Sequence, residues 1–237
     1  MKKKWGLALL LVLILCTLTA CGDKAEPQAA TSAAVEQSAE QNKEDNEAKS
    51  DTLIAVFSLS YNMAPDKDIK LVTSATLNKD GHALVGDTEQ MAELAQEITG
   101  ADRYNITLKE PYPADEEKVY EMAKKEQLKQ TRPALEDEME SLDAYDNIIL
   151  IYPNWFGDMP MAVYTFLESH ELKRKTIIPV VCYEAEDSGT ETSWQGIENV
   201  SKKVKLTEGY IVRSGATNTQ GTRTDFKQWL MDLDVRF

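Results

Sequence analysis

The sequence has little histidine, little cysteine and too few basic residues to balance its acids. Its 237 residues include two histidines, three cysteines, 26 Lys and Arg, and 40 Asp and Glu, which gives a formal charge of −14. Affinity for nucleic acid depends mainly on Lys and Arg neutralising phosphates, so a DNA- or RNA-binding function is excluded. Three cysteines are too few for a disulfide-stapled scaffold. Hydrophobic residues make up 42% of the chain, which is enough for one substantial core.

The first twenty residues have the pattern of an export signal. Three lysines precede an apolar stretch at 7–15 that is too short to span a membrane, and small residues follow it. Residues 18–21, Leu-Thr-Ala-Cys, resemble the lipobox of bacterial lipoproteins, which implies acylation of Cys21 by lipid chains such as palmitate. The alternative is a single-pass anchor with an incidental cysteine. We therefore expect a lipoprotein signal peptide at 1–20 and an extracytoplasmic protein held at the cell membrane by its lipid.

Residues 21–50 have the composition of a solvated tether. They are rich in Ala, Glu, Gln, Ser and Lys, and they contain no aromatic residue. Such a segment cannot bury enough apolar surface to offset its conformational entropy, so we expect it to be disordered. The formal charge is +3 on residues 1–20 and −4 on residues 21–50, which leaves −13 on residues 51–237. We predict that this last segment forms a single acidic domain.

Within that domain, short apolar runs alternate with helical patterns. Consecutive apolar residues, typical of parallel strands buried on both faces, occur at 53–57, 147–152, 176–183 and 209–213, and an alternating edge strand is predicted at 104–108. Helices are predicted at 87–99 with Asp87 or Thr88 as the N-cap, at 161–168, within the charged segment 113–140, and around Phe226 and Leu230. The pattern predicts an α/β fold, with an open, doubly wound sheet of five parallel strands and helices on both faces.

In such sheets, ligands bind beyond the carboxyl ends of the strands, so three loops are candidates for the site. Residues 58–62 offer hydroxyls and an amide, which together with backbone N–H groups can bind a phosphate. Residues 153–160 place Trp155 and Phe156 beside Gly157, as a platform for a planar ring would require. Residues 184–189 follow the third strand. A phosphate cradle facing a ring platform indicates a mononucleotide with a flat, uncharged head.

The same loops resemble those of flavodoxins. The resemblance is carried by Ser-Leu-Ser at 58–60, Gly-Asp-Thr at 86–88 and Tyr-Pro-Asn-Trp-Phe-Gly-Asp-Met-Pro at 152–160, and it covers about residues 52–233. It implies the five-stranded flavodoxin fold with FMN as the cofactor. The phosphate-binding positions that it implies are Ser58, Ser60, Asn62 and Thr88. The isoalloxazine-binding positions that it implies are Pro153, Asn154, Trp155, Phe156 and Gly157 in the second loop and Tyr183, Glu184, Ser188 and Gly189 in the third.

Some residues depart from the family pattern. Tyr61 stands where glycine is usual, Asp87 replaces an asparagine, and the third loop carries Glu184, Glu186 and Asp187. We expect a membrane-tethered FMN protein that transfers electrons to or from a redox partner. The alternatives are a flavodoxin-fold binding module that has lost FMN and an FMN-dependent NAD(P)H or quinone reductase. A hydrolase is disfavoured because the chain has no G-x-S-x-G motif.

The remaining candidate residues have simpler interpretations. Cys182 lies within an apolar run, and we expect it to be packed rather than redox-active. His82 and His170 are expected at the surface, without companions at metal-ligand spacing. For Trp155 and Phe156 the alternative is a purely structural place in the core. The acidic domain, with no Lys or Arg in the three loops, predicts a low reduction potential for a bound flavin.

Overall fold

A computed structural model describes residues 50–64, 78–80, 83–137, 139–184 and 189–237. These residues fall within one compact unit, Glu47–Phe237. The predicted signal peptide with Cys21 lies outside the described residues, as does nearly all of the predicted tether. The described part of the chain contains no helix that is both long and apolar enough to cross a membrane.

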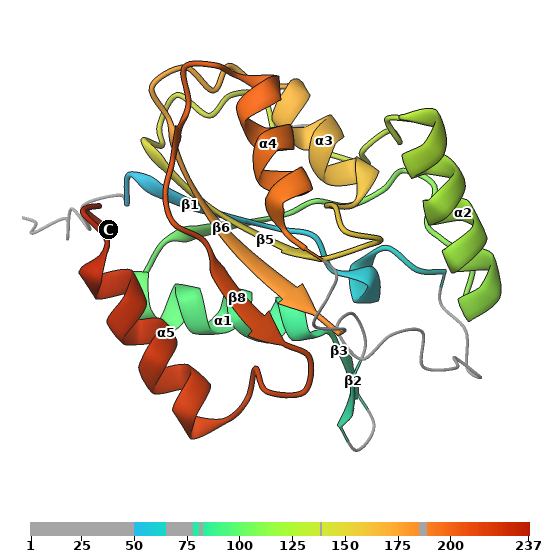
Figure 1. Cartoon of the computed structure of the whole chain (residues 1–237), viewed down its shortest axis with the longest axis horizontal. Helices are drawn as coiled ribbons and strands as arrows, with labels where there is room; N and C mark the ends of the chain where they lie inside the picture. Colours follow the sequence, from blue (N-terminus) through green and yellow to red (C-terminus); the bar gives the residue numbers. More distant parts are fainter. Residues whose placement is uncertain (1–49, 65–77, 81–82, 138, 185–188) are drawn as a thin grey trace, which may run out of the picture. The chain divides into compact units, whose positions relative to one another are not determined.

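The core of the molecule is one parallel sheet (Figure 1). Its strands are β1 (Thr52–Val56), β4 (Asp102–Asn105), β5 (Asn147–Pro153), β6 (Thr176–Tyr183), β7 (Lys205–Leu206) and β8 (Tyr210–Arg213). They are ordered β4-β1-β5-β6, and both β7 and β8 pair with β6. Two further strands, β2 (Asn78–Asp80) and β3 (Ala83–Val85), pair with each other as a separate antiparallel ladder. The predicted doubly wound parallel sheet is confirmed.

The fifth position of the sheet is shared by β7 and β8. Thr176 pairs with Lys205 and Val180 pairs with Tyr210, so one extra residue is accommodated between the two short strands. Pro179 of β6 lies opposite this break and has no N–H to donate to a continuous ladder. The sequence run 209–213 therefore predicted β8 correctly, while β7 was missed.

The helices are α1 (Asp87–Thr99), α2 (Glu116–Lys129), α3 (Met161–Glu168), α4 (Glu191–Val200) and α5 (Gln220–Asp232). Helices α1 and α5 cover one face of the sheet, and α3 and α4 cover the other, with α2 beside α3 (Figure 1). The strand residues divide accordingly: Leu53 and Ala55 pack on the α3 side, whereas Ile54 and Val56 pack on the α1 side. Burial on both faces explains why these strands are uninterrupted apolar runs.

Two elements differ from their predicted bounds by more than one residue. The edge strand runs over Asp102–Asn105 rather than 104–108, and beyond it the Leu108 N–H donates to the Asn62 side chain. The charged segment 113–140 is helical only over Glu116–Lys129, since Gln130 adopts a left-handed conformation with φ 52° and ends the helix.

Candidate functional site

The first loop begins directly after β1 and contains the short 3-10 helix η1 (Leu59–Tyr61). Ser58 caps it, with its hydroxyl accepting from the Ser60 N–H at 3.4 Å and lying 2.7 Å from the Ser60 hydroxyl. Ser58 is fully buried, and Ser60 is partly exposed. The structure therefore brings two of the predicted phosphate-binding hydroxyls together at the carboxyl edge of the sheet.

Asn62 holds this loop in place. Its amide N–H groups donate to the carbonyl oxygens of Ser58 at 2.8 Å and Ile106 at 2.9 Å, and its side-chain oxygen accepts from the Leu108 N–H at 2.6 Å. All three bonds are buried, and they tie the loop after β1 to the chain after β4. The amide is thus already engaged by backbone groups, which gives Asn62 a positioning role.

The first turn of α1 places a carboxylate against the same loop. Ser60 donates to Glu89 Oε2 at 3.0 Å, and the Tyr61 hydroxyl donates to Glu89 Oε1. Arg103 of β4 donates to the Tyr61 hydroxyl at 2.8 Å. Burial, with a further contribution from Glu89, raises the pKa of Tyr61 to about 12. Neither Glu89 nor Arg103 was among the predicted site residues.

Asp87 contacts a different loop. It is the first residue of α1, whereas a cap at Asp87 would place the start of the helix at Thr88. Gly86 is the N-cap and makes no side-chain cap. The Asp87 carboxylate is fully buried and accepts from the hydroxyls of Ser214 at 2.5 Å and Thr217 at 2.7 Å. The predicted cap is therefore wrong. Asp87 instead fastens the start of α1 to the loop after β8.

Thr88 is the remaining predicted phosphate-binding residue. It is fully buried, and among the described residues its hydroxyl has no hydrogen-bond partner. Buried hydroxyls are nearly always hydrogen-bonded, so an unsatisfied one beside a helix N-terminus calls for a ligand or an ordered water. This orphaned group fits a ligand with hydrogen-bonding oxygens.

The second loop is a tight turn that presents an aromatic side chain. Trp155 and Asp158 exchange backbone hydrogen bonds of 2.8 and 3.1 Å, and the two residues between them have positive φ, 56° at Phe156 and 81° at Gly157. This is the pattern of a type I′ turn, in which Asn or Gly is usual at the position of Phe156. A bulky residue in the left-handed region is strained, and such strain is concentrated at functional sites.

The aromatic rings of this turn pack against two different parts of the protein. Trp155 is partly exposed and contacts Phe57 and Tyr112 in edge-on arrangements, with ring centroids 5.4 and 5.8 Å apart. Phe156 lies against Tyr120 of α2 at 4.9 Å. Trp155 thus belongs partly to the core, as its structural alternative proposed, while part of its side chain remains exposed.

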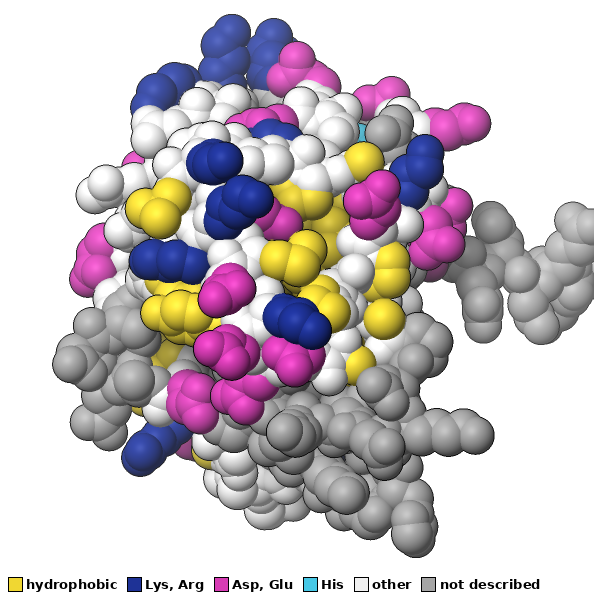
Figure 2. Space-filling view, turned by 90° about the vertical axis from the view of Figure 1, so that its right-hand side faces the viewer, with side chains coloured by type: hydrophobic (Ala, Val, Ile, Leu, Met, Phe, Trp, Pro, Cys, Tyr) yellow, Lys and Arg dark blue, Asp and Glu magenta, His cyan; other side chains and the backbone are white. Residues whose placement is uncertain are grey.

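Helix α2 also brings a positive charge to this turn. The Lys124 ammonium lies 4.6 Å from the centroid of the Phe156 ring, and Gln127 donates to the Phe156 carbonyl oxygen at 3.4 Å. Together with Arg103 at the first loop, Lys124 supplies a cation that the loop sequences themselves lack. Figure 2 shows the face that carries α2, where hydrophobic side chains lie among charged ones. Tyr120 and Leu128 of this helix are exposed.

The third loop is described at its two ends. Tyr183 is partly buried, Glu184 is exposed, and Gly189 has a positive φ of 41°, while Ser188 lies outside the described residues. Asn154 donates to the Gly189 carbonyl oxygen at 3.0 Å, so the second and third loops are directly joined. Asn154, one of the five predicted isoalloxazine positions at 153–157, is therefore held beside the third loop.

A buried acid supports the second loop from below. Asp158 accepts from its neighbour Met159 N at 2.7 Å and from the Tyr164 hydroxyl at 3.0 Å. Burial raises the pKa of Asp158, and burial together with the nearby Asp158 charge raises the pKa of Tyr164. The hydrogen bond between Asp158 and Tyr164 attaches the turn to the first half of α3.

Other candidate groups lie apart from the loops. Cys182 is fully buried, which confirms a packed residue, and burial raises the pKa of its thiol well above the ordinary value. His170, predicted at the surface, is partly buried, with its two ring nitrogens 2.6 and 2.8 Å from the carbonyl oxygens of Phe166 and Met139. His82 lies outside the described residues. Across the described ranges, no group of acidic, Cys and His side chains could hold a metal ion.

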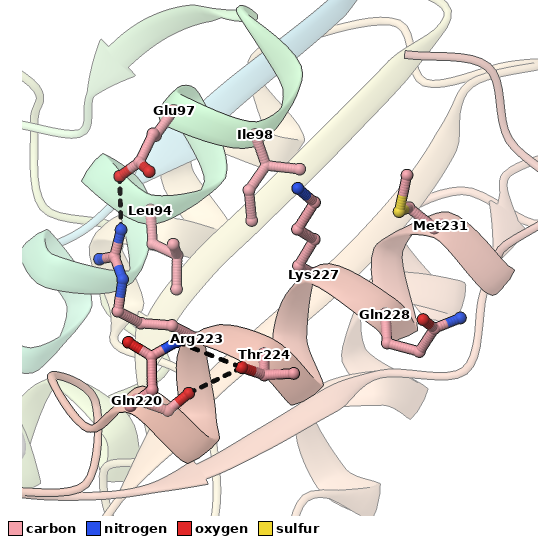
Figure 3. Close-up of a pocket in the computed structure, with 9 residues that line it drawn as sticks. All are labelled: Leu94, Glu97, Ile98, Gln220, Arg223, Thr224, Lys227, Gln228 and Met231. Carbon is pink, nitrogen blue, oxygen red and sulfur yellow. Dashed lines mark hydrogen bonds and ion pairs between the residues drawn. The ribbon is translucent and has the colours of Figure 1, made fainter.

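A groove of about 460 Å³ between α1 and α5 is distinct from the strand-end loops (Figure 3). It is lined by the later part of α1, including Leu94 and Ile98, and by α5. Arg223 bridges to Glu97 at 2.6 Å at one end of it. Its lining of long, flexible side chains lacks the aromatic platform of the second loop.

Comparisons with known proteins agree with this geometry. Residues 81–233, more than half of the chain, match the family model described as flavodoxin. Curated proteins gave no significant match. A solved structure from Bacteroides uniformis described as a flavoprotein is 21% identical, covers 78% of this chain and 99% of its own, and has a TM-score of 0.56. A second, from Bacteroides eggerthii, is also 21% identical, covers 78% of this chain and 98% of its own, and has a TM-score of 0.55.

A more distant structure, a flavoprotein from Lactobacillus acidophilus in complex with FMN, is 18% identical to this chain. It covers 71% of this chain and 95% of its own, with a TM-score of 0.46. The two Bacteroides structures establish the fold, and the family model establishes the relationship.

Proposed function

Since the chain belongs to the flavodoxin family, we propose that it binds a flavin, FMN, at the carboxyl ends of β1, β5 and β6 and that it transfers electrons. A bound flavin would supply the redox chemistry, while the protein supplies position, stacking and electrostatics. The observation that carries the proposal is the strained turn at Phe156 and Gly157, in a loop that a hydrogen bond from Asn154 joins to the third loop. The two Bacteroides neighbours, both described as flavoproteins, are consistent with it.

The described residues supply candidate contacts for both ends of a flavin. Trp155 and Phe156 would contact the ring system, and Pro153, Asn154 and Gly157 would shape the loop around it. Ser58 and Ser60 would face the phosphate end, where the buried Thr88 hydroxyl lacks a partner within the described chain. Lys124 and Arg103 add positive charge near the two ends, against the −13 background of residues 51–237.

We further propose that the protein acts outside the cytoplasm, anchored to the membrane by lipid at Cys21. The support is the basic, apolar and small-residue pattern of 1–20 that ends at a cysteine. A composition like that of residues 21–50 would let the domain reach a redox partner near the membrane surface.

Titration of the purified chain with FMN, followed by quenching of flavin fluorescence, tests the proposed function. Trp155→Ala is expected to weaken FMN binding about 5- to 150-fold, because a stacking partner is worth about 1–3 kcal/mol. Trp229→Ala is the matched control, since Trp229 is a partly buried indole in the core on the α1–α5 side of the sheet. Equal affinity in wild type and Trp155→Ala, with circular dichroism showing both folded, would contradict the stacking role. A module that has lost FMN would show no quenching at all.

A further inference from the structure

The hydroxyls of the first loop converge on one carboxylate. Ser60 donates to Glu89 Oε2, so the short contact between Ser58 and Ser60 has Ser58 as its donor. On the other side, Arg103 donates to Tyr61, and Tyr61 donates to Glu89 Oε1. Two chains of hydrogen bonds thus end on the two oxygens of the same side chain.

These hydrogen bonds stabilise a negative charge on the Glu89 side chain. Hydrogen bonds to a charged acceptor are roughly twice as strong as neutral ones, and a carboxylate in the first turn of a helix is further favoured by the helix dipole. Glu89 is the third residue of α1, and its carboxylate receives the hydroxyl of Ser60, one of the groups assigned to the flavin phosphate. A phosphate dianion brought to the same hydroxyls would meet a negative charge at close range.

We propose that Glu89 determines the flavin selectivity of the site by occupying the phosphate position with its own carboxylate. The site then recognises the ring system and its neutral ribityl chain, and it accepts riboflavin about as well as FMN. This inference rests on the proposed function, because it concerns the same pocket. Thr88 precedes Glu89 in α1, and its buried hydroxyl has no partner among the described residues. This hydroxyl could donate to a phosphate once the Glu89 carboxylate is removed.

The test compares dissociation constants for FMN and riboflavin in wild type and in Glu89→Gln. In wild type, the two constants are expected to agree within about threefold. Glu89→Gln keeps the size of the side chain and removes its charge, so FMN binding should tighten at least tenfold while riboflavin binding changes less than twofold. Glu93→Gln is the matched control: it makes the same charge change one turn further along α1, at an exposed position, and should alter neither constant.

A second variant and a second probe distinguish loss of the Glu89 charge from a change in the structure of the loop. Glu89→Ala removes the carboxylate altogether, and inorganic phosphate should then compete with FMN, as it should not in wild type. A wild-type preference for FMN of a hundredfold or more, unchanged or reduced in both variants, would overturn this inference and leave the proposed function standing. Failure of wild type and both variants to bind either flavin would overturn the proposed function itself.

Discussion

At the scale of single residues, the site depends on which side of α1 each acidic side chain faces. Successive helix residues are about 100° apart, so Asp87 and Glu89 point about 200° apart. With Gly86 as the N-cap, Asp87 faces Ser214 and Thr217, and Glu89 faces Ser60. The sequence showed an acid at the start of this helix but not its rotation, because that is fixed by contacts with loops far away in the chain.

Phe156 offers a residue-scale test that separates function from stability. Asn is the usual residue at the first central position of a type I′ turn, and relief of left-handed strain is worth about 1–2 kcal/mol. Phe156→Asn is therefore expected to unfold with a free energy equal to or higher than that of wild type, despite losing its contact with Tyr120. Its FMN affinity should fall about tenfold, as measured by urea denaturation and fluorescence titration.

Arg174 provides the control for this prediction. It is another non-glycine residue with positive φ, 68°, and it is exposed just before β6, at the opposite end of the strand from the site. Arg174→Asn should gain stability without changing FMN affinity. If Phe156→Asn also leaves the affinity unchanged, Phe156 is not part of the flavin site.

At the scale of elements, the parts predicted correctly are those that the local sequence determines. β1, β5 and β6 are buried on both faces and read as continuous apolar runs, and α1 and α3 were predicted with their observed bounds. Helix α4 was missed because Gly196 and several hydroxyl residues weaken its helical pattern. Gly196 is required by packing, since a Cβ there would collide with the Tyr164 hydroxyl.

The candidate site was predicted as three loops but not as a network. Ser58, Ser60 and the 153–157 turn follow from strand ends, which a sequence reveals. Glu89, Arg103 and Lys124 reach those loops from a helix turn, an edge strand and another helix. Their roles depend on tertiary packing between segments distant in sequence, for which a single sequence gives no signal.

The junction of β6, α4 and β8 gives an element-scale prediction. A Cβ on Gly209 would lie 2.7 Å from Trp194 Cζ2 and 3.0 Å from Pro179 Cγ. Gly209→Ala should therefore lower the free energy of unfolding by about 1–3 kcal/mol, as overpacking does. Gly221→Ala in α5 is the contrasting control, because its Cβ would meet no atom closer than 3.9 Å and alanine favours the helix. Urea denaturation in which Gly209→Ala is as stable as Gly221→Ala would contradict the close packing.

At the scale of the whole molecule, tyrosine burial sets the alkaline limit of stability. Burial raises the pKa of Tyr61 and Tyr145 to about 12, and it also raises those of Tyr112, Tyr152 and Tyr164. The unfolded chain loses these protons near pH 10, whereas the folded chain keeps them. Their contribution to stability is therefore complete below pH 10 and is lost as the pH rises toward 12.

We expect far-UV circular dichroism to show cooperative unfolding in this range, together with the rise in tyrosinate absorbance. Tyr61→Phe should move the transition to higher pH, because it removes one group that the unfolded chain ionises more readily. Tyrosinate formation near pH 10 in the folded chain, before any loss of circular dichroism, would contradict the assignment.

The proposed anchor is also a property of the whole molecule. Expressed in bacteria, the full chain should be found with the membrane fraction, and Cys21→Ser should release the mature domain or leave an unprocessed precursor without lipid label. Cys16→Ser is the matched control, because Cys16 lies within the leader and outside the lipobox. This variant should carry the same lipid label as the wild type. Equal lipid labelling of both variants, or of neither variant nor the wild type, would contradict acylation at Cys21.

The most direct measurement of the central claim is a crystal structure of the protein grown with excess FMN. We predict electron density for the ring system against Trp155 and the Phe156 turn, bounded on its other side by the loop between Tyr183 and Gly189. Density for a flavin elsewhere, such as the groove between α1 and α5, or strand-end loops filled by their own side chains at saturating FMN, would contradict the account.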